Sequence, residues 1–272
     1  MTTPDFLQRM ADASRARVRA ARQRVGEAEL LRRAESQAVP PRLVLGRFDV
    51  IAELKLRSPA AGGLATADFD RAAQIRAYAQ GGAAAVSVLT EPDEFKGTLE
   101  HLSEAAATLA PLGCPVMRKD FLTAPYQIVE ARAAGAGGVL LIVTMLADAD
   151  LRTMLATAAD LGLFVLLEAF DAADLERIAS FDVSAAAAPV LVGINCRNLK
   201  NLQVDFARFA TLARSLPPHL PAVAESGIAS IEDIRTVVAH GYRLALVGSA
   251  LMRTGDPAGE VRAFVAAGRT AA

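Results

Sequence analysis

The sequence has no tryptophan, and only 5% of its 272 residues are aromatic. A surface that binds single-stranded nucleic acid stacks bases on aromatic rings, and a nucleic-acid interface usually carries an excess of basic charge. The formal net charge here is -1 at pH 7, so we expect no nucleic-acid partner. The longest apolar runs, at 139–143 and 164–167, are far too short to span a bilayer. We therefore expect no membrane partner either.

Cysteine and histidine are scarce as well. Two cysteines, Cys114 and Cys196, suit a reducing cytoplasm better than an oxidising compartment, although a disulfide between them stays open. The histidines His101, His219 and His240 are scattered, and none stands at the end of a predicted strand. No spacing of His, Cys and Asp is typical of a metal site. We therefore expect a cytoplasmic protein without a bound metal.

The residues that are abundant define an alternating pattern. Hydrophobic residues make up 53% of the chain, which is enough for a sizeable core at this length. Short apolar runs predict strands at 50–55, 84–89, 116–119, 138–143, 164–168, 190–195, 222–225 and 244–247. Amphipathic stretches predict helices between them, for example at 68–80, 125–134, 148–161, 231–240 and 257–267. The strands are continuous apolar runs, which is typical of a parallel sheet covered on both faces.

Eight strand–helix units without a second composition block favour a closed (β/α)8 TIM barrel of the α/β class. An open, doubly wound sheet is the alternative, but it usually has a glycine-rich turn after its first strand. Here the first strand runs into Leu56-Arg57-Ser58-Pro59. We expect one domain over residues 1–272, with an N-terminal helical extension (1–45) before the barrel (46–272). This extension either covers the rim of the barrel or plugs its bottom.

Charged and polar side chains stand at the ends of five predicted strands. In a barrel, the functional side chains come from the carboxyl ends of the strands, and side chains two residues apart in a strand face the same way. Solvated strand ends are the alternative reading. Five such strands together favour an acid–base site, since charges over an apolar floor are costly unless paired and have displaced pKa values. The residues are Glu53, Lys55, Lys119, Glu168, Asn195, Arg197 and Glu225.

Two Gly–Ser steps indicate a phosphate site. Ser226-Gly227 follows the seventh strand and Gly248-Ser249 follows the eighth. Barrels often hold a phosphate in these two loops together with a short helix N-terminus, and glycine lets backbone N–H groups approach the anion. Two ordinary turns would look the same, but their placement at successive strand ends predicts a small phosphorylated molecule as the partner.

Seven segments also resemble one known family, from about residue 5 to about residue 265. The RKDF-x4-YQI-x2-ARAAGA and GIN-x-RNL blocks are highly specific, and the chain resembles the indole-3-glycerol-phosphate synthase family. The segments are IAELKLRSPAAG (51–62), VLTEPDEFKGTLEHL (88–102), PVMRKDFLTAPYQIVEARAAGAGGVLLIV (115–143), LLEAFD (166–171), VGINCRNLKNLQVD (192–205), AVAESGI (222–228) and LVGSALMR (246–253).

The resemblance implies a carboxy-lyase that uses no cofactor. The family closes the pyrrole ring of 1-(2-carboxyphenylamino)-1-deoxyribulose 5-phosphate and releases carbon dioxide and water. The product is indole-3-glycerol phosphate, for tryptophan or another indole pathway. Ring closure needs an acid at a carbonyl oxygen, and we expect a lysine held near other cations to be tuned for that role.

The resemblance also implies roles for single residues. Lys119 matches the general acid that protonates the ketone oxygen, and Glu168 and Glu53 match the acid–base carboxylates. Lys55 matches a lysine with a proton-transfer role in dehydration. Asn195 and Ser226 complete the catalytic set, Asn195 by orienting the intermediate. The expected substrate-binding residues are Ser58, Phe95, Phe121, Arg197, Glu225, Gly227, Gly248 and Ser249, with both phenylalanines as walls around the aromatic ring.

Three positions depart from the family pattern: Ala60, Phe170 and Cys196. Cys196 lies between two inward-facing residues, so we expect it to point away from the site. Phosphoribosylanthranilate isomerase is one competing hypothesis, but that activity relies on a cysteine at the end of strand 1. A phosphate-ligand binder without catalysis is the other, and the intact acid–base set argues against it. We expect a monomer, since no long apolar face stands out.

Overall fold

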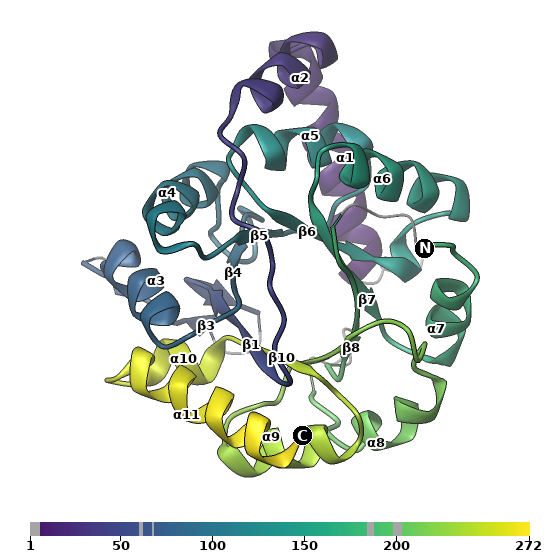
Figure 1. The fold of residues 1–272 in the computed structure, drawn as a ribbon. Helices are drawn as coiled ribbons and strands as arrows, with labels where there is room; N and C mark the ends of the chain where they lie inside the picture. Colours follow the sequence, from purple (N-terminus) through teal and green to yellow (C-terminus); the bar gives the residue numbers. More distant parts are fainter. Residues whose placement is uncertain (1–5, 60–61, 67, 184–187, 198–202) are drawn as a thin grey trace.

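The computed structural model describes residues 6–59, 62–66, 68–183, 188–197 and 203–272. Within these residues, eight parallel strands close into a barrel with the order β1-β10-β9-β8-β7-β6-β5-β4, and helices surround it (Figure 1). This confirms the predicted (β/α)8 barrel. The barrel strands are β1 (Asp49–Leu54), β4 (Ala85–Leu89), β5 (Val116–Lys119), β6 (Gly138–Ile142), β7 (Phe164–Ala169), β8 (Val190–Asn195), β9 (Ala222–Glu225) and β10 (Leu244–Val247).

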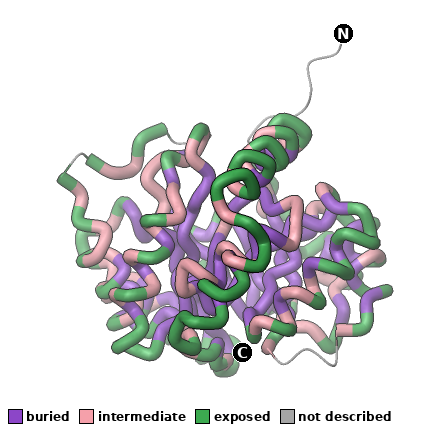
Figure 2. The backbone as a smooth tube through the Cα atoms, turned by 90° about the horizontal axis from the view of Figure 1, so that it is seen from above, coloured by how far each residue is buried: buried purple, intermediate pink, exposed green. Residues whose placement is uncertain are grey.

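The strands are continuous apolar runs because both of their faces are buried. In β7, Phe164 and Leu166 belong to the cluster that fills the barrel interior. The alternate residues Val165 and Leu167 belong to the larger cluster between the barrel and its helices. This alternation of side chains along each strand decides which residues can face the interior. Figure 2 shows the result, with buried strands inside a shell of partly exposed helices.

Five of the described outer helices begin at a side-chain cap. The side chains of Asp70, Thr98, Asp171, Ser230 and Asp256 each accept a backbone N–H at a helix start, which typically stabilises a helix by about 1 kcal/mol. Within the described residues, no helix is long and apolar enough to cross a membrane. The outer helices are α3 (Arg71–Gln80), α4 (Leu99–Leu109), α5 (Pro125–Ala133), α6 (Asp148–Asp160), α7 (Ala172–Ala179), α8 (Arg208–Leu212), α9 (Ile231–Ala239), α10 (Ser249–Arg253) and α11 (Pro257–Ala271).

Several predicted boundaries were wrong by a few residues. The helix predicted at 68–80 begins at Arg71, because the carboxylate of Asp70 accepts the N–H of Ala73 (2.8 Å) and caps the helix. Strand β1 ends at Leu54, so Lys55 follows the strand. A short antiparallel ribbon of β2 (Arg57–Ser58) and β3 (Gly62–Gly63) was not predicted.

The predicted N-terminal helical extension contains two helices. Helix α1 (Phe6–Arg24) and helix α2 (Glu27–Ser36) are separated at Gly26, whose backbone is extended (φ -68°, ψ 157°). The hydroxyl of Tyr126 donates to the carbonyl of Val25 (2.9 Å) and secures this break. Glycine is a poor residue for a helix interior, so the break falls where the local propensity is weakest.

The extension contacts both ends of the barrel. One part of it lies at the rim and another part lies at the bottom, so each of the two predicted alternatives applies to a different part of the extension. Phe6 of α1 packs edge-on against Phe121 at the carboxyl end of the barrel (5.8 Å between ring centroids). Residues 37–48 cross the opposite end (Figure 1), where Leu43 joins the interior cluster near Leu244. The division of one domain at residue 45 stays a prediction.

Candidate active site

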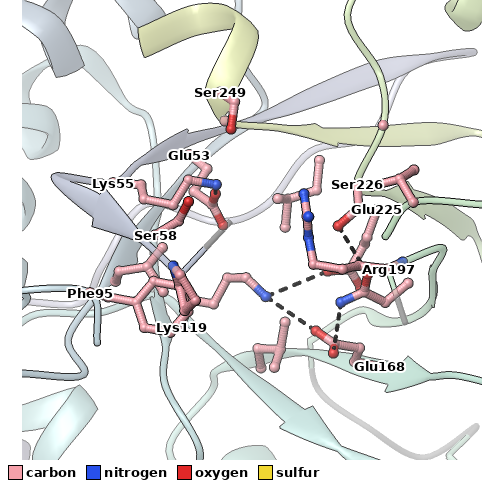
Figure 3. Close-up of a pocket in the computed structure, with 18 of the residues that line it drawn as sticks. Glu53, Lys55, Ser58, Phe95, Lys119, Glu168, Arg197, Glu225, Ser226 and Ser249 are labelled. Carbon is pink, nitrogen blue, oxygen red and sulfur yellow. Dashed lines mark hydrogen bonds and ion pairs between the residues drawn. The ribbon is translucent and has the colours of Figure 1, made fainter. Parts of the chain in front are cut away.

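One cavity of about 410 Å³ opens at the carboxyl ends of the barrel strands. Every site residue that the sequence predicted lines this cavity (Figure 3). The fourteen residues are Glu53, Lys55, Ser58, Phe95, Lys119, Phe121, Glu168, Asn195, Arg197, Glu225, Ser226, Gly227, Gly248 and Ser249.

Strand alternation explains why these side chains converge. Glu168 lies two residues beyond Leu166, which fills the barrel interior, so both face inward. Strand register then sets neighbours side by side, since Glu168 is paired with Gly193, and Asn195 with Glu225. A Cβ atom at Gly193 would come within 2.0 Å of Glu225 Oε1. The glycine therefore leaves the space that the Glu225 carboxyl occupies.

Lys119 lies among carboxylates. Its Nζ is 3.1 Å from Glu168 Oε2 and 3.6 Å from Glu225 Oε2. Burial acts to lower the pKa of Lys119, but the charges of Glu168, Glu225 and Glu53 outweigh it and raise the pKa above its ordinary value. The expectation of a lysine tuned by neighbouring cations was therefore wrong, and Lys119 is charged at neutral pH.

Glu225 and Glu53 have pKa values displaced in opposite directions. Burial and the nearby Glu168 carboxylate raise the pKa of Glu225 well above its ordinary value, and Lys119 offsets this only in part. Burial also acts to raise the pKa of Glu53, but the charges of Lys55 and Lys119 lower it below its ordinary value. Lys55 Nζ donates to Glu53 Oε1 at 2.6 Å. The cavity therefore holds one carboxyl that favours its neutral form and one that is ionised, the pattern by which one site carries out both acid and base steps.

Asn195 links three residues of the cavity wall. Its side-chain nitrogen donates to Glu168 Oε1 (3.1 Å), and its oxygen accepts from the Ser226 hydroxyl (2.9 Å) and from the backbone N–H of Arg197 (2.9 Å). Ser226 has a φ of 68°, which is uncommon for a residue other than glycine. The hydrogen bond to Asn195 helps to hold that strained conformation. Burial lowers the pKa of Arg197 below its ordinary value.

The two predicted glycines lie where a side chain would not fit. Gly227 has a φ of 86°, and a Cβ atom there would lie 2.7 Å from Val204. A Cβ atom at Gly248 would lie 2.3 Å from Glu53 Oε1 and 3.1 Å from Lys55 Nζ. The backbone at Gly248 is thus in close contact with the Glu53–Lys55 pair, and α10 begins at the next residue.

An aromatic wall closes one side of the cavity. The rings of Phe95 and Phe121 are tilted by 42°, with centroids 6.2 Å apart. Phe6, which also lines the cavity, extends this wall from α1. Phe6 was not predicted as a site residue, because nothing in the pattern of the N-terminal helix indicates which residue reaches the rim. Asp120, which lines the cavity beside Lys119, was not predicted either.

Two of the family departures, Cys196 and Phe170, lie outside the polar part of the cavity. Cys196 is fully buried in the cluster between barrel and helices, as expected from its place between two inward-facing residues. Phe170 packs against the interior cluster, and Ala60 lies outside the described residues. Among the described residues, no group of three or more His, Cys, Asp and Glu could hold a metal ion.

A closed barrel with lysines and carboxyl groups gathered at the carboxyl ends of its strands defines a (β/α)8-barrel enzyme of acid–base chemistry. Residues 7–264 match the family described as indole-3-glycerol phosphate synthase. The chain belongs to the indole-3-glycerol phosphate synthase family.

Curated relatives agree with the family match. An indole-3-glycerol phosphate synthase of a Nocardioides species is 46% identical over 237 residues, covering 85% of this chain and 87% of the relative. The Bordetella pertussis enzyme of the same name is 40% identical over 270 residues, covering 96% of this chain and 99% of the relative. The solved structure of 3-hexulose-6-phosphate synthase from Salmonella typhimurium superposes with a TM-score of 0.61 at 13% identity, over 83% of this chain and 100% of that one. That last likeness extends to the fold alone.

Proposed function

We propose that the protein is an indole-3-glycerol-phosphate synthase. It would close the pyrrole ring of 1-(2-carboxyphenylamino)-1-deoxyribulose 5-phosphate and release carbon dioxide and water. The observation that carries this proposal is the convergence of two lysine–glutamate pairs in one cavity. Lys119 lies 3.1 Å from Glu168, and Lys55 lies 2.6 Å from Glu53.

Substrate binding follows from the two sides of the cavity. The phosphate binds at Gly227, Gly248 and Ser249, where glycines let backbone N–H groups approach it, and Lys55 supplies a cation beside Gly248. The aromatic ring lies against Phe95 and Phe121. The cation of Arg197 binds the substrate carboxylate, and Ser58 and Glu225 complete the contacts.

The first lysine–glutamate pair serves ring closure. Lys119, kept protonated by its carboxylate neighbours, donates a proton to the ketone oxygen as the aromatic carbon attacks the carbonyl carbon. Glu168 accepts a hydrogen bond from Lys119 at Oε2. The side-chain nitrogen of Asn195 donates to Oε1 of the same carboxylate and so orients Glu168. The carboxylate that Arg197 binds then leaves as carbon dioxide, and the electron pair of the broken carbon–carbon bond restores the aromatic ring.

The second pair serves dehydration. Lys55 protonates the departing hydroxyl, and Glu53, whose pKa is lowered, takes the ring proton as a carboxylate. Lys119, Lys55 and Glu53 then regain their starting protonation states by exchange with solvent. Asn195, held in place by the hydrogen bond from Ser226, orients the intermediate at the strand ends.

The test is a turnover assay with purified protein and the carboxyphenylamino-deoxyribulose phosphate. Because the chain has no tryptophan, the indole product is followed by fluorescence against a low background. Lys119→Met should lower kcat by about 10²- to 10⁴-fold, the range for removing a general acid. Lys96→Met, at an exposed lysine outside the cavity lining, is the control. No product at high enzyme concentration, or a near-normal rate for Lys119→Met, would contradict the proposal.

A cytoplasmic monomer completes the proposal. Both cysteines are buried and unpaired, which supports a reducing compartment. The large exposed apolar residues of the described chain are distributed over different elements, which supports a monomer, and sedimentation velocity tests it. They are Leu31, Val39, Val44, Leu112, Val204 and Ile231.

A further inference from the structure

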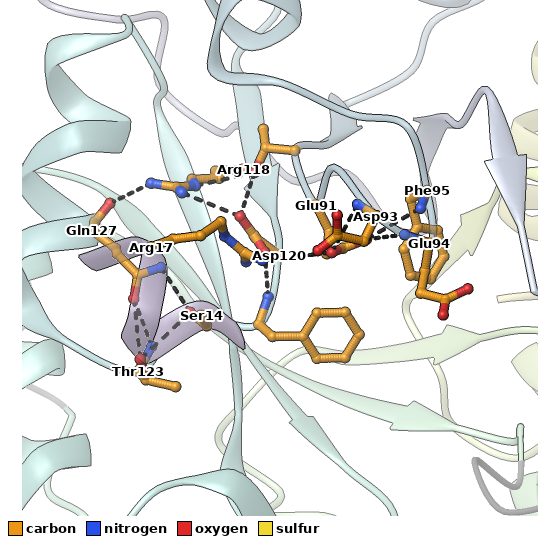
Figure 4. Close-up of polar contacts among 12 residues, drawn as sticks. Ser14, Arg17, Glu91, Asp93, Glu94, Phe95, Arg118, Asp120, Thr123 and Gln127 are labelled. Atoms are coloured by element: carbon orange, nitrogen blue, oxygen red, sulfur yellow. Dashed lines mark hydrogen bonds and ion pairs between the residues drawn. The ribbon is translucent and has the colours of Figure 1, made fainter. Parts of the chain in front are cut away.

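A second polar network lies behind the aromatic wall, centred on Asp120 (Figure 4). Asp120 is 3% exposed. Its Oδ1 accepts from the guanidinium of Arg17 (2.8 Å) and from the backbone N–H of Phe121 (2.8 Å). Its Oδ2 accepts from the hydroxyl of Thr90 (2.8 Å) and from Arg118 (3.2 Å). These four hydrogen bonds to its two oxygens fix the orientation of the Asp120 carboxylate.

The same network includes Glu91, which is fully buried. Its carboxylate accepts the backbone N–H groups of Asp93 (3.1 Å), Glu94 (2.7 Å) and Phe95 (3.1 Å). These bonds fold the chain after β4 into a tight loop that ends at Phe95. Arg17 NH1 also donates to Glu91 Oε1 at 3.5 Å.

Arg17 is therefore the bridge between the two carboxylates, with one nitrogen toward Asp120 and the other toward Glu91. A planar guanidinium fits such a bridge, whereas an ammonium is a single point of charge. Arg118 neutralises Asp120 only in part, because it also pairs with Glu130 (3.2 Å). Without Arg17, two buried carboxylates would share too little positive charge, and a buried charge that loses its partner is strongly destabilising.

Each of these carboxylates orders a different part of the cavity. Asp120 stands between Lys119 and Phe121 in the sequence, and both neighbours line the cavity. Glu91 orders the loop that carries Phe95, whose ring packs against Phe121. Arg17 itself is absent from the cavity lining. Its effect on the site must therefore pass through Asp120 and Glu91.

We propose that Arg17 is a positioning residue, through which α1 fixes the Lys119 ammonium and the aromatic wall relative to each other. This inference rests on the proposed function. It assigns the N-terminal helix a role in the reaction that differs from covering the rim. The guanidinium of Arg17 sets the distance between Lys119, the proton donor, and the substrate ring that attacks. A displacement of about 1 Å at reacting groups can cost about 10²-fold in rate.

The test compares Arg17→Met and Arg17→Lys with the control Arg15→Met. Arg15 is half-exposed on the same helix, and its ion pair within the described residues is with Asp12, one turn away. Arg17→Met should lower kcat/KM by at least about tenfold, and Arg17→Lys should recover part of that loss, since lysine reaches one carboxylate at a time. Arg15→Met should stay within twofold of the parent protein.

A second readout separates positioning from general loosening of the fold. The proposed phosphate contacts come from the loops after β9 and β10, whereas the hydrogen bonds and ion pairs of Arg17 within the described residues are with Glu91 and Asp120. The dissociation constant of inorganic phosphate, measured by titration calorimetry, should therefore be unchanged within twofold in the Arg17 variants. A kcat/KM within threefold of the parent, a phosphate affinity that falls by the same factor, or equal losses for Arg17→Met and Arg17→Lys would each overturn the proposal. Absence of turnover in the parent protein would instead reject the proposed function.

Discussion

Replacing Gly248 by alanine should reduce activity far more than stability. The new Cβ atom would lie 2.3 Å from Glu53 Oε1, closer than real side chains approach. That oxygen is the end of a side chain that borders the cavity, so it can withdraw without disturbing the core. To restore an ordinary contact it must move by about 1 Å, a displacement that can cost about 10²-fold at a reacting group. The movement also breaks its 2.6 Å contact with Lys55 Nζ.

The expected result for Gly248→Ala is a fall in kcat/KM of about 10²-fold, which corresponds to about 2.7 kcal/mol of transition-state stabilisation. The melting temperature should change by less than about 4 °C, since the stability cost stays near 1 kcal/mol. Indole fluorescence gives the rate and thermal unfolding gives the stability. Gly255→Ala, in the loop after α10, is the matched control because a Cβ atom there meets nothing within 4 Å.

Two outcomes would refute this reasoning. A Gly248→Ala variant with activity within threefold of the parent would mean that Glu53 need not occupy its observed position. A variant that loses activity and folding together would mean that the contact disturbs the barrel rather than the cavity.

Two further predictions concern ionisation. The raised pKa of Glu225 contributes stability that is fully present below the unfolded-state pKa of about 4.3 and is lost as pH rises through the folded-state pKa. Glu225→Gln carries no such loss, so the difference between its free energy of unfolding and that of the parent should shift in favour of the variant as pH rises above about 5 in urea titrations. A difference that stays constant with pH would argue against a raised pKa of Glu225. Burial raises the pKa of the Cys114 and Cys196 thiols to about 12, so a chromogenic disulfide reagent at pH 8 should label neither in the folded protein and both in urea. Rapid labelling of either thiol in the native protein would be inconsistent with its burial.

The fold could be predicted because its signals are local. Continuous apolar runs and the polar residues between them gave the strands and helices to within a few residues, since each strand of the barrel is buried on both faces. The errors lie where a side chain competes with the backbone. Asp70 delays the start of the predicted helix by capping it, and Gly26 separates the two N-terminal helices at a break that Tyr126 secures. Such contacts depend on tertiary structure and leave little trace in a hydrophobic pattern.

The composition of the cavity could be predicted because strand ends and side-chain alternation are visible in sequence. The electrostatics could not. The sequence shows that Lys119 is near other ionisable groups, but only the strand register brings Glu168 and Glu225 within 4 Å of it. The contribution of α1 was also hidden. Phe6 and Arg17 lie more than a hundred residues from Phe121 and Asp120 in the chain, and nothing in an amphipathic pattern marks them as partners.

The chain before β1 contacts both openings of the barrel, with Phe6 at the end that holds the cavity and Leu43 at the other. The segment before β1 therefore covers part of the barrel opening at each end. A cut after residue 36 would remove α1 and α2, and with them the contacts at the mouth that admits ligand, but would keep residues 37–48 across the opposite opening. The two openings are therefore served by separate parts of one segment, and a cut between these parts separates their contributions.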